Sequence, residues 1–369
     1  MSKVKLENIS KTFDGKKYVL NNVNLSFDDK SFVVILGPSG CGKSTLLNII
    51  AGLETQTSGK VFINDEDVSN FEPKNRKIGM VFQNYTLYPH LNVFNNLAFA
   101  LKLKHEKKDE IKKKVNNIAE LLKIENLLNR KPHQLSGGQK QRVAIGKALI
   151  QKPNVYLFDE PLSSLDANLK KDMCSELITL HNQTNQTFLY VTHDQQEAMA
   201  LATHIVLLNN GEVIQFGTKH EIEQTPQNLF VAKFINLFDI NIFEAHITKQ
   251  TKHLLYVKLF DKILKLRKNT DINLQQKTLI AATKPQNISI QNNGLNAKIT
   301  YVENLNFSRL VTITLSDGTL VKLIDNSDDR LVNLQDVYID INFNKFMFFG
   351  DEQDKYLDLK FLEIKENKL

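Results

Sequence analysis

The sequence has 369 residues, of which 42% are hydrophobic and 24% are charged, and its formal net charge is +6. This length predicts two domains, and the composition predicts packed cores and excludes a disordered chain. Only six of the 47 basic residues are arginine, and the lysines are scattered along the chain. Nucleic-acid-binding proteins rely on arginine and on clustered positive charge, so no nucleic-acid partner is expected.

The cysteine pattern and the hydropathy pattern limit the setting of the protein. Cys41 and Cys174 lie far apart and neither belongs to a C-x-x-C pair, which argues against a disulfide framework or a zinc site and fits a reducing cytoplasm. No apolar run approaches the roughly 18 residues of a membrane span, and the N-terminal residues contain no apolar signal core. If the protein serves a membrane, we expect it to dock there as a peripheral protein.

The first half of the chain alternates short apolar runs with helical patterns. Residues 33–37, 154–160 and 187–194 have the length and β-branched content of buried strands, and the last two end in polar residues. A glycine-rich turn follows the first of these strands and leads into a helix over 44–53. This order predicts an α/β fold around a parallel sheet.

A helical stretch lies between the first two of these strands. Its apolar residues recur at the spacing of one helix face: Ile111, Val115, Ile118 and Leu122. The charge-dense run from Lys102 to Lys114 is interpreted as a solvated face of that helix and its approach. We assign a helical subdomain to about residues 88–150.

The texture changes after Phe234, where short strands separated by polar turns replace the alternating pattern. The expected strands span residues 245–248, 254–260, 277–283, 297–303, 310–315, 319–324 and 337–343. Many short strands at regular spacing predict a small all-β domain, here an OB-like barrel. We therefore expect one domain over 1–235 and a β-rich domain over 236–369.

A P-loop pattern, G-x-x-x-x-G-K-[ST], spans Gly37–Ser44 between a strand and a helix. Its glycines let backbone N–H groups surround phosphates, and the helix N-terminus adds partial positive charge. Lys43 is expected to reach the β- and γ-phosphates, Ser44 to bind Mg²⁺ and Thr45 to add a phosphate hydrogen bond. Cys41 is interpreted as a small filler. The candidate phosphate-binding residues are Gly37, Pro38, Ser39, Gly40, Cys41, Gly42, Lys43, Ser44 and Thr45.

Two carboxylates follow the apolar strand that begins at Val155. At the end of a buried strand, Asp159 is expected to hold Mg²⁺, directly or through water. Glu160 is one residue further on and points elsewhere, so we expect it to polarise the attacking water as a general base.

A second glycine-rich string opens another helix, whose sequence is QKQRVAIGKALI. Two adjacent glycines and a serine before a helix make a further anion-binding N-terminus, with Ser136 as a side-chain donor. One molecule has little need of two phosphate cradles around one nucleotide, so we expect two chains to pack head-to-tail and each to cover the other's ATP. The string comprises Leu135, Ser136, Gly137, Gly138 and Gln139.

The order of these motifs resembles that of ABC transporter ATPases. The family order is P-loop, Q-loop glutamine, LSGGQ signature, Walker B strand with glutamate, D-loop and H-loop histidine, and the chain matches it from residue 3 to about 235. The resemblance implies that Gln83 contacts Mg²⁺ and the attacking water, and that His193 hydrogen-bonds the γ-phosphate. It also implies that Asp166, in the D-loop Ser164-Leu165-Asp166, lies at the dimer seam.

An aromatic residue before the P-loop also matches the family. Phe13 corresponds to the residue that stacks on adenine, and Tyr18 is the nearby alternative. A phenylalanine buried in the core is the competing interpretation of Phe13.

Four stretches of the chain narrow the resemblance. They are AGLETQTSG, IGMVFQNYTLYPHLNVFNNLAF, SGGQKQRVAIGKAL and DEPLSSLDANLK, and they are similar to importer ATPases for maltose, multiple sugars and glycerol phosphate. Those subunits carry a C-terminal β-rich (TOBE) regulatory domain. The resemblance implies an ATP- and Mg²⁺-dependent homodimer on the cytoplasmic face of the cell membrane, which powers uptake of a sugar or sugar-related solute. Its implied partners are permease subunits, bound at Gln83–Leu97, and indirectly a solute-binding protein.

The tail departs from that subfamily, and alternatives remain. Ala282–Gln286 stands where the family has G-x-R-P-E, and Asn236–Asn241 where it has a glycine-rich linker. Polyamine importer ATPases share the run Lys131–Gln139. An ABC-type ATPase acting on nucleic acid is a more distant alternative, against which the lack of coiled coils and of a second cassette argues. A P-loop kinase or GTPase has no place for the LSGGQ string or for His193. The solute itself is chosen by other subunits.

Overall fold

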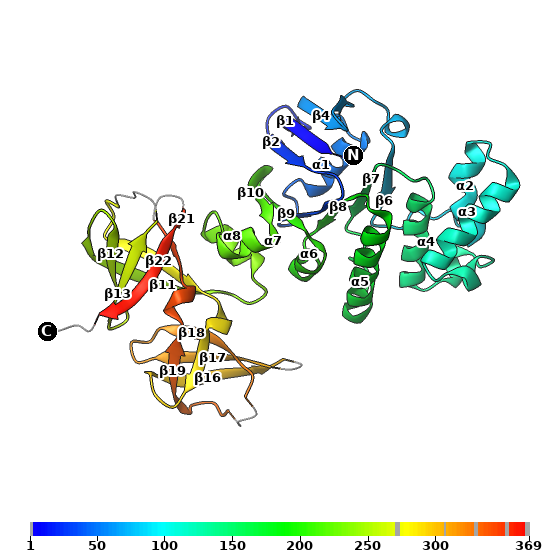
Figure 1. The fold of residues 1–369 in the computed structure, drawn as a ribbon. Coiled ribbons are helices and arrows are strands. Elements are labelled where there is room, and N and C mark those ends of the chain that lie inside the picture. Colours follow the sequence, from blue (N-terminus) through cyan, green and yellow to red (C-terminus); the bar gives the residue numbers. More distant parts are fainter. Residues whose placement is uncertain (1–2, 270–273, 306–307, 328–330, 351–353, 366–369) are drawn as a thin grey trace. The chain divides into compact units, whose positions relative to one another are not determined.

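A computed structural model describes residues 3–269, 274–305, 308–327, 331–350 and 354–365 (Figure 1). The chain divides into two compact units, Met1–His220 and Glu221–Leu369. This division lies earlier in the chain than the domain boundary near residue 235 that the sequence predicts.

Two sheets form the first unit in the part of the chain that the structure describes. A four-stranded antiparallel sheet has the order β2-β1-β4-β5, and a six-stranded sheet has the order β10-β9-β3-β8-β7-β6. In the larger sheet only the edge strand β10 runs antiparallel to its neighbour. The strands are β1 Val4–Thr12, β2 Tyr18–Phe27, β3 Phe32–Leu36, β4 Ser58–Ile63, β5 Glu66–Asp67, β6 Ile78–Val81, β7 Val155–Asp159, β8 Thr187–Thr192, β9 His204–Asn209 and β10 Glu212–Thr218.

The core of this unit lies between the two sheets. Helix α1 (Lys43–Ala51) contributes Leu46, Leu47, Ile49 and Ile50 to a buried cluster that also contains residues of both sheets. All five residues of β3 are buried, which matches the unbroken apolar run predicted for a central parallel strand.

The strand order gathers four segments at one edge of the larger sheet. Strands β3, β8, β7 and β6 are consecutive neighbours and parallel, so their carboxyl ends lie side by side. Ligands of open α/β sheets bind outside the carboxyl ends of the strands. The residues that follow these strands therefore lie where a ligand of this sheet would bind.

Three helices form a group within residues 88–150, where the sequence predicts a helical subdomain (Figure 1). They are α2 Val93–Leu103, α3 Lys108–Leu121 and α4 Gly137–Leu149. In α3 the apolar spacing buries Ile111 and Val115. Helices α5 (Ala167–Thr184) and α6 (Gln195–Leu201) follow β7 and β8. Over the described ranges, no helix has the length and hydropathy that crossing a membrane requires.

Two antiparallel sheets form the second unit, as far as its described residues go. The seven-stranded sheet has the order β21-β20-β14-β11-β12-β13-β22, the five-stranded sheet has the order β15-β19-β16-β17-β18, and one buried cluster draws on both. This architecture fits the predicted OB-like domain. The strands are β11 Asn241–Gln250, β12 Leu254–Leu259, β13 Lys262–Lys268, β14 Thr278–Thr283, β15 Ile288–Gln291, β16 Leu295–Asn304, β17 Arg309–Leu315, β18 Leu320–Asp325, β19 Asp336–Ile341, β20 Met347–Phe349, β21 Tyr356–Leu357 and β22 Leu359–Lys365.

Helix α8 (Leu229–Ile235) packs on the seven-stranded sheet. Its residues Leu229 and Ala232 share a buried cluster with Ala282, Met347 and Phe349. The preceding helix α7 (Lys219–Gln224) spans the division between the units. Because α8 packs on this sheet, the second unit begins before residue 235.

Candidate active site

The turn between β3 and α1 depends on glycine at two positions. A Cβ on Gly37 would lie 2.1 Å from the carbonyl oxygen of Leu208, so only glycine allows this approach of β3 to β9. Gly42 has φ of +103°, which side-chain-bearing residues rarely adopt. Because Gly42 is the N-cap of α1 and has no side chain, the first N–H groups of α1 are left open to an anion.

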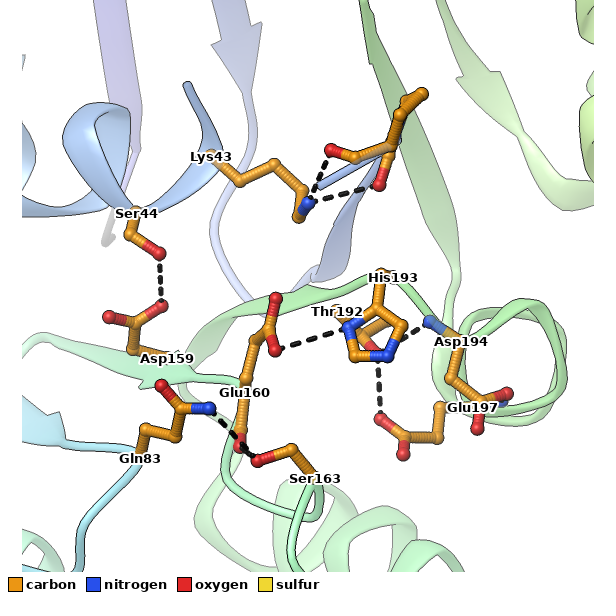
Figure 2. A network of polar contacts seen from close by, with 12 residues as sticks. Lys43, Ser44, Gln83, Asp159, Glu160, Ser163, Thr192, His193, Asp194 and Glu197 are labelled. Carbon is orange, nitrogen blue, oxygen red and sulfur yellow. Dashed lines mark hydrogen bonds and ion pairs between the residues drawn. The ribbon is translucent and has the colours of Figure 1, made fainter. Parts of the chain in front are cut away.

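A hollow lies at this turn, and Lys43 reaches into the loop beside it. The hollow is lined by Val19, Ser39, Gly40, Gly42, Lys43, Ser44, Thr45 and Glu160. The Nζ of Lys43 donates hydrogen bonds to the carbonyl oxygens of Gly37 and Pro38, both at 2.9 Å (Figure 2). Cys41 is buried and desolvation raises the pKa of its thiol, which agrees with its interpretation as a filler.

Ser44, which lines the hollow, is hydrogen-bonded to Asp159 at the end of β7. The hydroxyl of Ser44 donates to Oδ1 of Asp159 at 2.8 Å (Figure 2). Burial raises the pKa of Asp159, and the nearby charge of Glu160 adds to this, while the Ser44 hydrogen bond and Lys43 act in the opposite direction. A hydroxyl and a carboxylate that share a hydrogen bond beside a phosphate cradle are a donor set that suits Mg²⁺.

Glu160 faces the opposite way from its neighbour Asp159. Its Oε2 lies 3.1 Å from Nδ1 of His193 (Figure 2). Its amide donates to the carbonyl of Val191 at 3.1 Å. Glu160 has φ of +41°. A non-glycine residue held in this left-handed conformation stores strain, which is common at functional sites.

Gln83 joins this edge through Ser163, a residue that the sequence did not predict. Nε2 of Gln83 donates to Oγ of Ser163 at 3.3 Å, and Ser163 donates to the carbonyl of Glu160 at 2.9 Å (Figure 2). Two residues after Gln83, the hydroxyl of Tyr85 lies 2.6 Å from Oγ of Ser164. The Q-loop is therefore bonded to the turn that follows Glu160.

The signature residues begin α4 away from the P-loop hollow. Ser136 is the N-cap of α4, where its Oγ accepts from the amide of Gln139 and the Gln139 side chain accepts from the amide of Ser136. A Cβ on Gly138 would lie 2.9 Å from the Leu169 side chain, so glycine lets α4 approach α5 closely. Asp166 is in turn the N-cap of α5 and accepts from the amide of Leu169 at 3.0 Å.

Phe13 is an exposed aromatic residue and not part of the core. Its exposed fraction is 63%, and that of Tyr18 is 51%. The Nζ of Lys11 lies 4.7 Å from the centroid of the Phe13 ring, and the same ammonium pairs with Glu54 at 2.6 Å. This cation–π contact helps to fix the ring.

Comparisons with known proteins place the chain in a family. Residues 20–163 match the family model described as ABC transporter. An sn-glycerol-3-phosphate import ATP-binding protein, UgpC, from Bartonella bacilliformis is 49% identical over 74% of this chain and 76% of its own length. The protein of the same name from Yersinia pestis bv. Antiqua is 48% identical over 67% of this chain and 70% of its own.

Solved structures extend the agreement to the fold. A dimeric structure of the ATP-binding cassette MJ0796, in a post-hydrolysis state with ADP and Pi, is 36% identical and has a TM-score of 0.53. The match covers 58% of this chain and 98% of that one.

The parallel sheet, the P-loop and the two carboxylates at one edge define a P-loop ATPase. The comparisons make the class specific: the chain belongs to the ABC transporter family, as one of its ATP-binding, ATP-hydrolysing subunits.

Proposed function

We propose that this chain energises an importer for a sugar or sugar-related solute, such as glycerol phosphate, from the cytoplasmic face of the cell membrane. The names of the UgpC relatives support this class of solute. Permease subunits and, indirectly, a solute-binding protein are its partners. The geometry that supports ATP hydrolysis as the source of energy is the pair Glu160–His193 beside the P-loop.

In this proposal Ser44, Asp159 and Gln83 hold the Mg²⁺ that accompanies ATP. The ion supplies positive charge next to the phosphate oxygens. Lys43 exchanges the carbonyls of Gly37 and Pro38 for the β- and γ-phosphates, which fill the space beside the open N-terminus of α1. Thr45 and the remaining P-loop residues bind phosphate oxygens, and the exposed ring of Phe13 stacks on adenine.

Glu160 acts as the general base. It accepts a proton from the water that attacks the γ-phosphorus, while the bond from that phosphorus to the oxygen bridging to ADP breaks. His193 holds Glu160 through the contact at 3.1 Å and hydrogen-bonds the γ-phosphate. Gln83 orients the water and senses the permease.

Two copies of the chain complete two sites. Leu135–Gln139 of one copy covers the ATP in the P-loop of the other, and Asp166 lies at the seam. The open N-terminus of α1 and the glycine start of α4 support this arrangement, because each offers N–H groups to phosphate. The β-rich unit takes the regulatory role.

A groove beside the Q-loop suits the permease. Its lining includes Met80, Phe82 and Tyr85 from the Q-loop side and Lys147 from α4. The Nζ of Lys147 bonds the carbonyl of Thr86 at 2.8 Å, and burial lowers its pKa. An apolar groove of this kind is suited to a helix of a partner.

The role of Glu160 is tested by Glu160→Gln, which keeps the shape and removes the base. Steady-state ATP hydrolysis should fall by at least about a hundredfold. The variant should accumulate as an ATP-bound dimer in size-exclusion chromatography with ATP and Mg²⁺. Normal steady-state hydrolysis in this variant would contradict the assignment.

The solute class is tested on the whole complex. The chain, co-purified with its permeases and solute-binding protein, should show ATPase activity that glycerol phosphate or a sugar stimulates. Stimulation by spermidine or putrescine would instead favour the polyamine alternative, which the run Lys131–Gln139 keeps open.

A further inference from the structure

A buried charged cluster lies beneath the loop that carries His193. At its centre is the carboxylate of Glu197, a residue of α6 with an exposed fraction of 4%. The carboxylate accepts hydrogen bonds from the hydroxyls of Tyr190 and Thr192, each at 2.8 Å, and pairs with Nζ of Lys170 at 3.0 Å. A buried carboxylate is costly unless it is satisfied in this way.

The cluster fixes the backbone on both sides of His193. The hydroxyl of Thr192, which donates to Glu197, accepts from the amide of Asp194 at 3.0 Å. Asp194 is also the N-cap of α6, where its Oδ1 accepts from the amide of Glu197. His193 lies between these two residues, and Figure 2 shows its ring in contact with Glu160 while Glu197 contacts Thr192.

Lys170 connects the cluster to α5. Besides Glu197 it pairs with Oδ2 of Asp194 at 3.1 Å. Its own amide donates to the carbonyl of Asp166, one helical turn earlier, at the start of α5. The ammonium therefore ties the segment after the D-loop to the loop that carries His193.

We propose that Glu197, held by Lys170, is a positioning residue for His193. The position of α5, the helix that follows the D-loop, then determines the geometry of the histidine. This inference rests on the proposed function of His193 and deepens it. Glu197 is buried and does not line the P-loop hollow. Its effect on hydrolysis must then pass through Thr192, Asp194 and His193.

The test is a double-mutant cycle on ATP hydrolysis by the full chain. Glu197→Gln keeps the side-chain shape and removes the charge that Lys170 and the two hydroxyls satisfy. We expect kcat to fall by about tenfold to a hundredfold, as for a misplaced catalytic group, with KM for ATP nearly unchanged. In a His193→Ala background, Glu197→Gln should cause no further loss of kcat.

Companion variants separate positioning from folding. Lys170→Met should lower kcat as Glu197→Gln does, and Lys170→Arg should restore most of it. Lys171→Met, at the next and exposed position of α5, is the matched control and should leave kcat unchanged. Thermal unfolding of every variant shows whether a loss of kcat merely follows a loss of folded protein.

The outcomes distinguish the two levels of the proposal. Normal hydrolysis by His193→Ala would overturn the proposed function of the histidine. If His193→Ala is impaired but Glu197→Gln is not, the positioning role alone is overturned. Losses that multiply in the double variant would also overturn it, because they would show that Glu197 acts independently of His193.

Discussion

Two adjacent carboxylates, Asp159 and Glu160, have different surroundings. Asp159 is half-buried at the end of β7 and accepts the Ser44 hydroxyl. Glu160 is turned by its left-handed backbone toward His193. The different environments support a metal-binding role for the first and a proton-accepting role for the second.

Asp159 should destabilise the nucleotide-free protein at neutral pH. Burial raises its pKa above the unfolded value of about 3.9. The ionised form is therefore disfavoured in the fold, and the resulting loss of stability grows as pH rises through the unfolded pKa to the raised pKa. Asp159→Asn should raise the melting temperature of the ATP-free protein at pH 7 while abolishing hydrolysis.

The gain should shrink as pH falls toward 4, because protonation of the aspartate in the folded state, and increasingly in the unfolded state, removes the difference between them. Thermal unfolding from pH 4 to pH 8 measures it, with the exposed Asp172→Asn as control. A melting temperature equal to or below that of the unchanged protein at pH 7 would be inconsistent with a burial cost at Asp159.

The sequence predicted those candidate site residues that belong to contiguous motifs. It missed Ser163, Lys170 and Glu197, since their partners are distant in the chain or depend on the turn after Glu160. It included Tyr85 in the segment expected to bind the permease but did not predict its hydrogen bond with Ser164. One signal was available for Glu197: it lies three residues after the N-cap Asp194, the spacing of a capping box.

Among the elements, the turn from β3 to α1 shows two distinct reasons for glycine. At Gly37 the obstacle to a side chain is the carbonyl of Leu208, whereas at Gly40 it is only the φ of +78°, with open space around it. Gly37→Ala should lower the free energy of unfolding by about 3 kcal/mol or more, and Gly40→Ala by about 1 kcal/mol. Urea unfolding of both variants tests the difference, and equal losses would show that β3 and β9 can separate freely at this point.

Arg76 joins the end of α1 to the loop after β5 through its buried guanidinium. Its nitrogens donate to the carbonyls of Ile49 and Ile50 at the end of α1, and of Ser69 and Phe71, at 2.7 to 3.0 Å. Desolvation lowers its pKa, and the negative end of the α1 dipole opposes this cost.

Arg76→Met should therefore lower the free energy of unfolding by about 3 kcal/mol, because buried carbonyls lose a charged donor. Arg76→Lys should recover only part, since an ammonium cannot reproduce the planar fork. Chemical unfolding measures both, with the exposed Arg130→Met as control. A loss below that of the control would refute the capping role.

Elements with a clear apolar or motif pattern followed from the sequence, whatever their length, and many others did not. Strands β3, β7 and β8 and helices α1, α3 and α4 lie within a few residues of their predicted spans. No strand was assigned at β1, β2, β4, β5, β6, β9 or β10 in the first unit, and β13, β15, β20, β21 and β22 were missed in the second. Strand β22 pairs with β13 across roughly a hundred residues of chain, and the two-residue β21 is defined by its partner β20, so local pattern carried little information on either.

For the whole molecule, the sequence predicted two regions of different class, and the structure has two compact units with separate buried clusters. The division lies before α8, because the apolar face of α8 meets the β-rich sheet. A boundary drawn from composition has no access to that contact.

The head-to-tail dimer remains the central proposal at this scale. Within one chain the signature turn packs on Leu165 and Leu169, while the phosphate cradle opens at Gly42 and Lys43. The proposal gives each nucleotide one cradle from each copy.

Complementation between two defective variants tests this most directly. Lys43→Ala disables the P-loop, and Ser136→Arg blocks the signature turn; each should hydrolyse almost no ATP alone. In a mixed dimer, the intact P-loop of the Ser136→Arg chain meets the intact signature of the Lys43→Ala chain. We predict that mixing the two folded proteins restores ATPase activity above either alone. If the mixture stays as inactive as its components, the signature does not act on the partner's nucleotide, and the head-to-tail dimer is contradicted.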